Sequence, residues 1–397
     1  MTASKPASPS LKAKLILLSA TTLFALGFAE CGLRIVQKGG SGWTKVPTIE
    51  DRLAAVPAKS GKRALALGDS FTEYKDDVGK NWFRFALAGL DGWDGVNLGQ
   101  TGTGLAHYRL NLDTHARALA PDLVVTALYL GNDLQDYEIV LAKEARGIPI
   151  EPVSTSTKVD GGLGASLSRV SVLFATIARL TKRSEGTVFD RNLALAAKLY
   201  AIDDDEIARR LAKVDPDLLQ RARGERVNPW DLAFAVVRPT RYADVTLLRE
   251  GTDGPRALER FLADLESFHV ACSALARCAY VVIPAPPQVH ARYADYLVRT
   301  GYELPSDMVG ASPLMIALRG FMRAHAMPFV DLVDVLGAHT DEELFLPDDV
   351  HLNDRGQELA GLAARALFDL AAPPPTAPPP TAPSPASADA GTPAQSL

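Results

Sequence analysis

The sequence of 397 residues is poor in cysteine, with only Cys31, Cys272 and Cys278. Three cysteines exclude a disulfide framework, and their spacing does not fit a structural zinc site. The chain also lacks an excess of basic residues, since its formal net charge is −5, and this argues against a nucleic-acid-binding surface. We find no internal repeat. What is present is ample apolar material, 47% of all residues, which is enough to build a real core.

The N-terminus predicts export. Three lysines, at positions 5, 12 and 14, precede an uncharged run at 15–29. A basic start before an apolar stretch is typical of a signal sequence, and two forms of it remain open for residues 1–36. The segment is cleaved after the small residues Gly27 and Ala29, or it stays as a membrane anchor. Either form predicts a body in the periplasm or cell envelope, anchored or secreted.

The cysteines in the body leave a second alternative open. Cys272 and Cys278 lie six residues apart at a predicted helix-to-strand junction. In an exported protein they could form a disulfide, or they could be two small buried hydrophobic residues.

The chain divides by composition. Residues 37–60 are rich in Gly, Ser, Lys and Pro and are typical of a linker, whereas residues 373–397 are rich in Pro, Ala, Ser and Thr and predict a disordered tail. The body at 61–372 is interrupted by an insertion at about 146–250. Helical patterns at 167–182, 190–200, 204–214 and 217–223 and the lack of an obvious strand predict that this insertion is mostly helical.

Within the body, short apolar runs alternate with helical patterns. Near-continuous apolar strands are expected where helices cover both faces of a sheet. The sequence therefore predicts a three-layer α/β/α domain with a mainly parallel sheet. The predicted strands are 63–67, 95–98, 122–130, 279–283 and 329–332, and the predicted helices are 82–90, 254–277, 312–325 and 357–370.

Polar residues that can carry chemistry follow several of the predicted strands. Gly68-Asp69-Ser70 comes directly after the first strand, and Asn97-Leu98-Gly99 and Gly131-Asn132-Asp133 come after the next two. Carboxyl ends of parallel strands meet at one edge, where open α/β folds bind ligands. A hydroxyl there could act as a nucleophile, and a glycine amide or an asparagine side chain could donate to an oxyanion. Each segment alone is also typical of an ordinary turn or helix cap.

A fourth segment precedes the last helix and contains Asp348 and His351. An aspartate three residues before a histidine can reach its Nδ1 and leave Nε2 free to take a serine proton. Together, the four segments resemble the motifs of the SGNH (GDSL-like) hydrolase family: GDS at 68–70, N-x-G-x-x-G at 97–102, N-D at 132–133 and D-x-x-H at 348–351. The resemblance covers roughly 61–145 and 255–372.

The resemblance implies an SGNH, flavodoxin-like fold and a catalytic triad of Ser70, His351 and Asp348. It also implies an oxyanion hole from the Ser70 and Gly99 amides and the Asn132 side chain. Asp349 stands next to Asp348, and spacing favours Asp348 as the partner of His351. Where the family often has leucine after GDS, this chain has Phe71.

The function expected from these residues is that of an extracytoplasmic serine ester hydrolase acting on carbohydrate O-acyl or lipid esters. The expected partner is a small ester or an acylated polysaccharide, and no metal or organic cofactor is needed. Two alternatives remain: an O-acyltransferase that modifies a cell-surface polysaccharide, and a non-catalytic module that binds the envelope.

Overall fold

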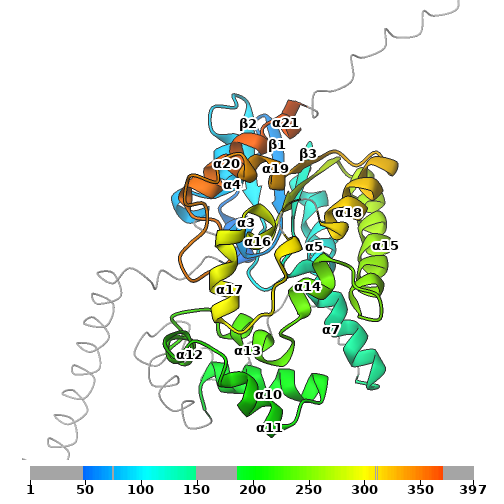
Figure 1. Ribbon diagram of the computed structural model, residues 1–397. Coiled ribbons are helices and arrows are strands. Elements are labelled where there is room, and N and C mark those ends of the chain that lie inside the picture. Colours follow the sequence, from blue (N-terminus) through cyan, green and yellow to red (C-terminus); the bar gives the residue numbers. More distant parts are fainter. Residues whose placement is uncertain (1–47, 74–75, 149–185, 309, 311, 370–397) are drawn as a thin grey trace, which may run out of the picture.

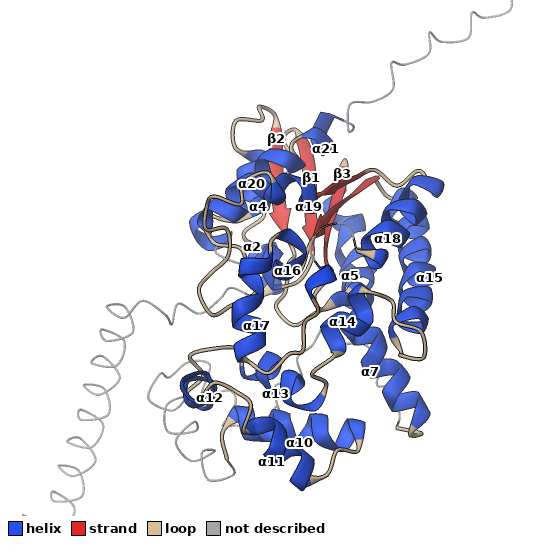
Figure 2. Cartoon of the chain, viewed as in Figure 1, coloured by secondary structure: helices blue, strands red, loops and turns tan. Residues whose placement is uncertain are grey.

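The computed structural model describes residues 48–73, 76–148, 186–308, 310 and 312–369. In these ranges five strands form one parallel sheet in the order β2-β1-β3-β4-β5, which lies between two layers of helices (Figures 1 and 2). The predicted α/β/α class with a parallel sheet is confirmed. The strands are β1 (Lys62–Leu67), β2 (Trp93–Asn97), β3 (Leu123–Tyr129), β4 (Arg277–Ile283) and β5 (Phe329–Asp331).

The apolar runs of the strands explain why both faces are covered. In β1, Ala64 and Ala66 point to one helical layer, and Leu65 and Leu67 point to the other. All four side chains are fully buried. Successive strand residues face opposite sides of a sheet, so an unbroken apolar run needs helices on both sides.

One helical layer packs on the Ala64 face and the other on the Leu65 face. Figure 1 shows α4 and α20 on one side of the sheet and α15 and α18 on the other. The first layer has α4 (Trp82–Leu87), α16 (Pro286–Val289), α17 (Asp295–Arg299), α19 (Leu332–Gly337), α20 (Asp354–Ala364) and α21 (Ala366–Asp369). The second has α2 (Ile49–Ala54), α5 (Leu105–Asn111), α6 (Arg117–Leu119), α7 (Asp133–Ala145), α15 (Gly254–Ser273) and α18 (Pro313–Ala324).

The described part of the insertion is helical, and it lies beyond the end of the sheet at which the strands finish (Figure 1). Four of its helices begin with side-chain caps, at Thr187, Asp203, Asp215 and Asn228. The predicted helix at 167–182 lies outside the described residues. The helices of the insertion are α10 (Val188–Tyr200), α11 (Asp204–Leu211), α12 (Pro216–Arg223), α13 (Pro229–Val237) and α14 (Arg241–Thr246).

Short turns of other helix types complete the fold. Besides the short α-helix α3 (Ser70–Glu73), they are the π-helical turn Leu112–Ala116 and the 3-10 turns Asp76–Val78, Ala291–Ala294 and Ser306–Met308.

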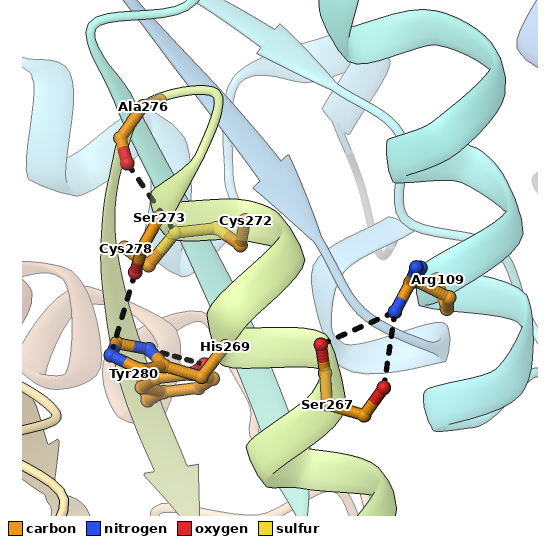
Figure 3. The surroundings of a disulfide bond; sticks show 8 residues. All are labelled: Arg109, Ser267, His269, Cys272, Ser273, Ala276, Cys278 and Tyr280. Atoms are coloured by element: carbon orange, nitrogen blue, oxygen red, sulfur yellow. Dashed lines mark hydrogen bonds between the residues drawn. A yellow bond between two sulfur atoms is a disulfide. The ribbon is translucent and has the colours of Figure 1, made fainter.

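Cys272 and Cys278 form a disulfide that joins the end of α15 to the start of β4 (Figure 3). Their Cα atoms are 6.0 Å apart. The pairing that the sequence left open is thus present. No helix within the described ranges is both long and apolar enough to cross a membrane. The predicted signal or anchor at 1–36 and the tail at 373–397 lie outside those ranges.

Candidate active site

The site lies where the order of the strands reverses. β1 has β2 on one side and β3 on the other, and open α/β folds bind ligands at such a point. Ser70 follows β1 as the first residue of α3, and Asn132 follows β3. The turn into α3 needs glycine at 68, because a Cβ there would lie 2.1 Å from Oγ1 of Thr72. The close approach of α3 to β1 therefore fixes where the Ser70 hydroxyl stands.

Ser70, His351 and Asp349 form a hydrogen-bonded row. Nε2 of His351 lies 2.6 Å from Oγ of Ser70, and Nδ1 lies 2.6 Å from Oδ1 of Asp349. The same carboxylate oxygen accepts the amides of Val350 and His351 at 2.6 and 3.2 Å. The structure thus brings together Ser70 and His351, two of the three triad residues predicted from sequence, with Asp349 in the place predicted for Asp348.

The prediction that Asp348 serves His351 is wrong. Asp348 turns away and accepts Nη1 of Arg221 at 2.6 Å and Nη2 of Arg299 at 2.9 Å. Its backbone has φ +53°, in the left-handed region, and this reverses the direction of the chain just before Asp349. Sequence spacing assumes a regular turn, so it could not reveal this reversal.

The charges around His351 favour its protonated form. Burial alone would lower the pKa of His351, but the hydrogen bond and charge of Asp349, with the charges of Asp69 and Asp231, raise it above its ordinary value. Burial acts in the opposite direction on Asp349, yet its hydrogen bond with His351 lowers the pKa of that carboxyl. The pair is therefore suited to accept a proton at His351 and to stabilise the imidazolium that results.

Asn132 is held by the residue that precedes the serine. Its Nδ2 donates to Oδ2 of Asp69 at 3.0 Å, while Oδ1 of Asp69 accepts the Phe71 amide at 3.0 Å. An amide nitrogen carries two hydrogens, so one N–H of Asn132 remains for another acceptor. The Ser70 amide is in the first turn of α3, where amides have no partner within the helix. Ser70 and Asn132 thus follow two neighbouring strands, β1 and β3.

The Gly99 amide was predicted to donate to the oxyanion, but in the structure it already has an acceptor. That amide donates to Oδ1 of Asn97 at 2.8 Å. Glycine is required here for close packing, because a Cβ would lie 2.7 Å from both the Glu73 amide nitrogen and Cβ of Thr72. Gly99 therefore serves to bring its loop against the turn that carries Ser70.

Two arginines that the sequence analysis did not single out hold the loops beside the site. Nη2 of Arg52 donates to the Gly99 carbonyl at 2.7 Å, and Nη2 of Arg241 donates to the Gly131 carbonyl at 2.9 Å. The fully buried Glu138 side chain lies 3.0 Å from Nε of Arg241. Both arginines are far in sequence from the loops they hold, so no local signal could have identified them.

Aromatic rings pack beside His351. The Phe71 ring lies 4.7 Å from that of His351 and 4.3 Å from that of Tyr129, measured between centroids. The Tyr129 hydroxyl is buried beside Tyr242, and the buried Tyr296 hydroxyl has no hydrogen-bond partner among the described residues. Tyr296 and Asp349 also line a cavity of about 480 Å³.

The helix α13 of the insertion places Asp231 near His351, where its charge helps to raise the pKa of the histidine. Burial and the negative charge of Asp349 raise the pKa of Asp231 to about 6. Its backbone carbonyl accepts the Tyr302 hydroxyl at 3.3 Å. Within the described ranges, no group of three or more His, Cys, Asp or Glu side chains is arranged to hold a metal ion.

Comparison with solved structures finds similar chains of low identity. A lipolytic protein of the G-D-S-L family from Veillonella parvula has 11% identity and a TM-score of 0.36, covering 78% of this chain and 99% of its own. A catalytic mutant of an acetylxylan esterase from Geobacillus stearothermophilus has 11% identity and a TM-score of 0.36, and the match covers 79% of this chain and 96% of that protein. A lipase/acylhydrolase from Enterococcus faecalis has 13% identity and a TM-score of 0.35, and the match covers 78% of this chain and 95% of that protein.

No family model matches the chain, and no curated protein matches it in sequence. The chemistry of the site is therefore inferred from its own contacts.

Proposed function

We propose that the chain is a serine ester hydrolase with Ser70 as nucleophile, His351 as general base and Asp349 as the carboxylate that orients His351. The observation that carries this proposal is the unbroken row from Ser70 Oγ to His351 and Asp349, with two contacts of 2.6 Å. A serine hydroxyl is a weak nucleophile unless an adjacent base takes its proton. The row supplies that base and fixes its tautomer through Nδ1.

In this mechanism, Oγ of Ser70 attacks the ester carbonyl while Nε2 of His351 takes the hydroxyl proton. The tetrahedral intermediate collapses as the imidazolium returns the proton to the alkoxide oxygen, and the alcohol leaves. Water, deprotonated by His351, then attacks the acyl-enzyme, and the imidazolium returns the proton to Oγ of Ser70 as the acid is released. The Ser70 amide and the free N–H of Asn132 are the proposed donors to the oxyanion.

We place the activity outside the cytoplasm, on a short-acyl ester of a hydroxylated alcohol such as a carbohydrate. The Cys272–Cys278 disulfide supports an oxidising compartment, as does the N-terminal sequence pattern. Among the described residues the buried Tyr296 hydroxyl, which lines the same cavity as Asp349, has no hydrogen-bond partner, and this supports a polar alcohol over a long acyl chain. Hydroxyl groups of an alcohol could satisfy such buried polar atoms, whereas a hydrocarbon could not. Lipid esters remain the second substrate class to test.

Labelling with a fluorophosphonate probe tests the proposal directly. The parent chain is expected to be labelled, and the Ser70→Ala variant is not. Because Ser70 is small and half-buried, the variant should melt at nearly the same temperature as the parent. A parent that is folded but labelled no better than Ser70→Ala would favour the non-catalytic envelope-binding module instead.

A panel of esters then separates the enzyme classes. It should run from acetyl to long-chain p-nitrophenyl esters and include acetylated polysaccharides. Free acid as the product supports a hydrolase. Acyl groups recovered on an added polysaccharide, in place of free acid, would show that the site acts as an O-acyltransferase.

A further inference from the structure

We propose that Asp348, Arg221 and Arg299, here called the Asp348 clamp, position the Asp349–His351 pair, so that the helical insertion controls the geometry of the catalytic loop. This inference rests on the proposed function, in which His351 is the base. Asp348 is therefore not a catalytic residue but a positioning residue that acts through its neighbour.

The loop that carries Asp349 and His351 is closed at its base by backbone contacts. The conformation of its tip depends on side-chain contacts. The Leu346 amide donates to the His351 carbonyl at 2.8 Å, and Phe345 pairs with Leu352 in an antiparallel bridge. Asp348 stands between these closing contacts. Its φ of +53° sets the direction in which the chain enters Asp349.

Two guanidinium groups hold the Asp348 side chain from different parts of the fold. Arg221 belongs to α12 of the insertion, and Arg299 is the last residue of α17. Nη1 of Arg221 lies 2.6 Å from Oδ2 of Asp348, and Nη2 of Arg299 lies 2.9 Å from Oδ1. Each carboxylate oxygen thus has its own arginine, and the two contacts together fix the orientation of the Asp348 carboxylate.

The two arms of the clamp are also joined to each other. Nε of Arg299 donates to Oδ2 of Asp215, which caps α12, at 3.2 Å. The Asp215 amide in turn donates to the Arg299 carbonyl at 3.0 Å. A shift of α12 would therefore move both arginines and, with them, the tip of the catalytic loop.

A role in positioning fits these contacts better than a role in stability. The three side chains are 20–33% exposed, and ion pairs at such positions contribute little to the free energy of unfolding. Aspartate tolerates the left-handed region better than most residues do, so the backbone at 348 can hold φ +53° when the side chain is anchored. What the anchors determine is the direction of Asp349, and a misplacement of about 1 Å can cost a catalytic site about 100-fold.

The first experiment removes the arginines from the full chain. Arg221→Met, Arg299→Met and the double variant are compared with Arg223→Met, a matched control on the same helix that pairs with Asp190 instead. The double variant should lose about 10- to 100-fold in kcat with KM changed less than about twofold. Its melting temperature and that of the control should stay close to that of the parent, and the control should keep its kcat.

Variants of Asp348 separate the side-chain contacts from the backbone conformation. Asp348→Asn keeps an acceptor oxygen for one of the two arginines and tolerates the left-handed region, so it should lose less activity than Asp348→Gly. Asp348→Gly accepts φ +53° without strain but has no side chain to hold, so it should lose as much as the double arginine variant. Combining Asp348→Gly with Arg221→Met should then add little further loss.

A signal from His351 itself keeps the test independent of turnover. The NMR resonance of the Nδ1 proton of His351 reports its hydrogen bond to Asp349, and it should broaden or move upfield in the double arginine variant. The pH profile should change too: the acid limb of kcat/KM moves to lower pH as Asp349 loosens, while Asp69 and Asp231, which also face His351, are left in place.

The outcomes distinguish the two proposals. A parent without labelling or turnover contradicts the proposed function. An unchanged His351 signal in the double variant, an active parent with equally active clamp variants, or a loss that follows the melting temperature contradicts the clamp.

Discussion

Nδ2 of Asn132 donates to the Asp69 carboxylate at 3.0 Å, and this bond joins the ends of two neighbouring strands, β1 and β3. Asp69 is fully buried beside Ser70, and burial raises its pKa. The bond uses one N–H of the Asn132 amide and leaves the other for a further acceptor. The orientation of the proposed oxyanion donor is thus set by the residue just before the nucleophile.

Asn132→Ala should lower kcat by about 10²- to 10³-fold, because one preorganised oxyanion donor is lost. The Asn132 side chain makes no cap bond to α7, so the melting temperature should change little. Steady-state kinetics with a p-nitrophenyl ester and a thermal melt measure the two effects. Unchanged kcat in a folded Asn132→Ala variant would remove Asn132 from the oxyanion hole.

Asp349→Asn should lower kcat by about 10³- to 10⁴-fold, because the amide can no longer fix the His351 tautomer. The same change at Asp348 is the matched control and should cost far less, since that side chain contacts Arg221 and Arg299 instead. Parallel kinetics on the two variants measure the difference. A larger loss at 348 than at 349 would contradict the assignment made here.

The activity should fall as the pH is lowered through the pKa of His351. The base must be neutral to accept the Ser70 proton, and the surrounding carboxylates raise its pKa above the ordinary value of 6.5. The acid limb of kcat/KM should therefore have its midpoint above pH 6.5, and Asp349→Asn should move it down. Rates are read from pH 5 to 9 with the spontaneous hydrolysis of the ester subtracted. A midpoint well below 6.5 in the parent would argue against His351 as the base.

Arg241→Met should destabilise the fold by about 3–5 kcal/mol, because it leaves the buried Glu138 carboxylate without its nearest cation. It also frees the Gly131 carbonyl beside Asn132. The matched control is Arg256→Met, whose side chain is 67% exposed and should change stability by less than about 0.5 kcal/mol. Urea unfolding curves measure both. Equal midpoints for the two variants would show that the buried pair is not important for stability.

Removing the disulfide should lower stability by about 2 kcal/mol, as expected for so short a closed loop. The double variant Cys272→Ala/Cys278→Ala should nevertheless keep its kcat, because Cys278 lies at the start of β4 and the site lies where the strands end. Thermal melts and ester turnover, with the parent in reducing buffer as a second comparison, measure these effects. A loss of kcat in the folded double variant would mean that α15 influences the site.

The sheet could be predicted from sequence because its strands are unbroken apolar runs between turn residues. Each of the five predicted runs overlaps one of the five strands of the described sheet, and no end differs by more than two residues. The helix α13 was not predicted, because residues Leu232–Val237 are buried on all sides and show no amphipathic period.

The nucleophile and base could be predicted because each follows a recognisable segment. The carboxylate could not, since the choice between Asp348 and Asp349 depends on one backbone angle, the φ of +53° at Asp348. The contacts that stabilise that angle come from Arg221, 127 residues away in the chain. Long-range ion pairs of this kind leave no local pattern in a single sequence.

Ser70 follows β1, which is paired on both sides, whereas His351 comes after β5, a three-residue strand that pairs only with β4 among the described residues. Segments at a sheet margin open at lower cost than those at its centre. On warming, the base should thus drift from the nucleophile before the sheet melts. Moderate heating would therefore cause a reversible loss of activity, and unfolding would follow only at higher temperature.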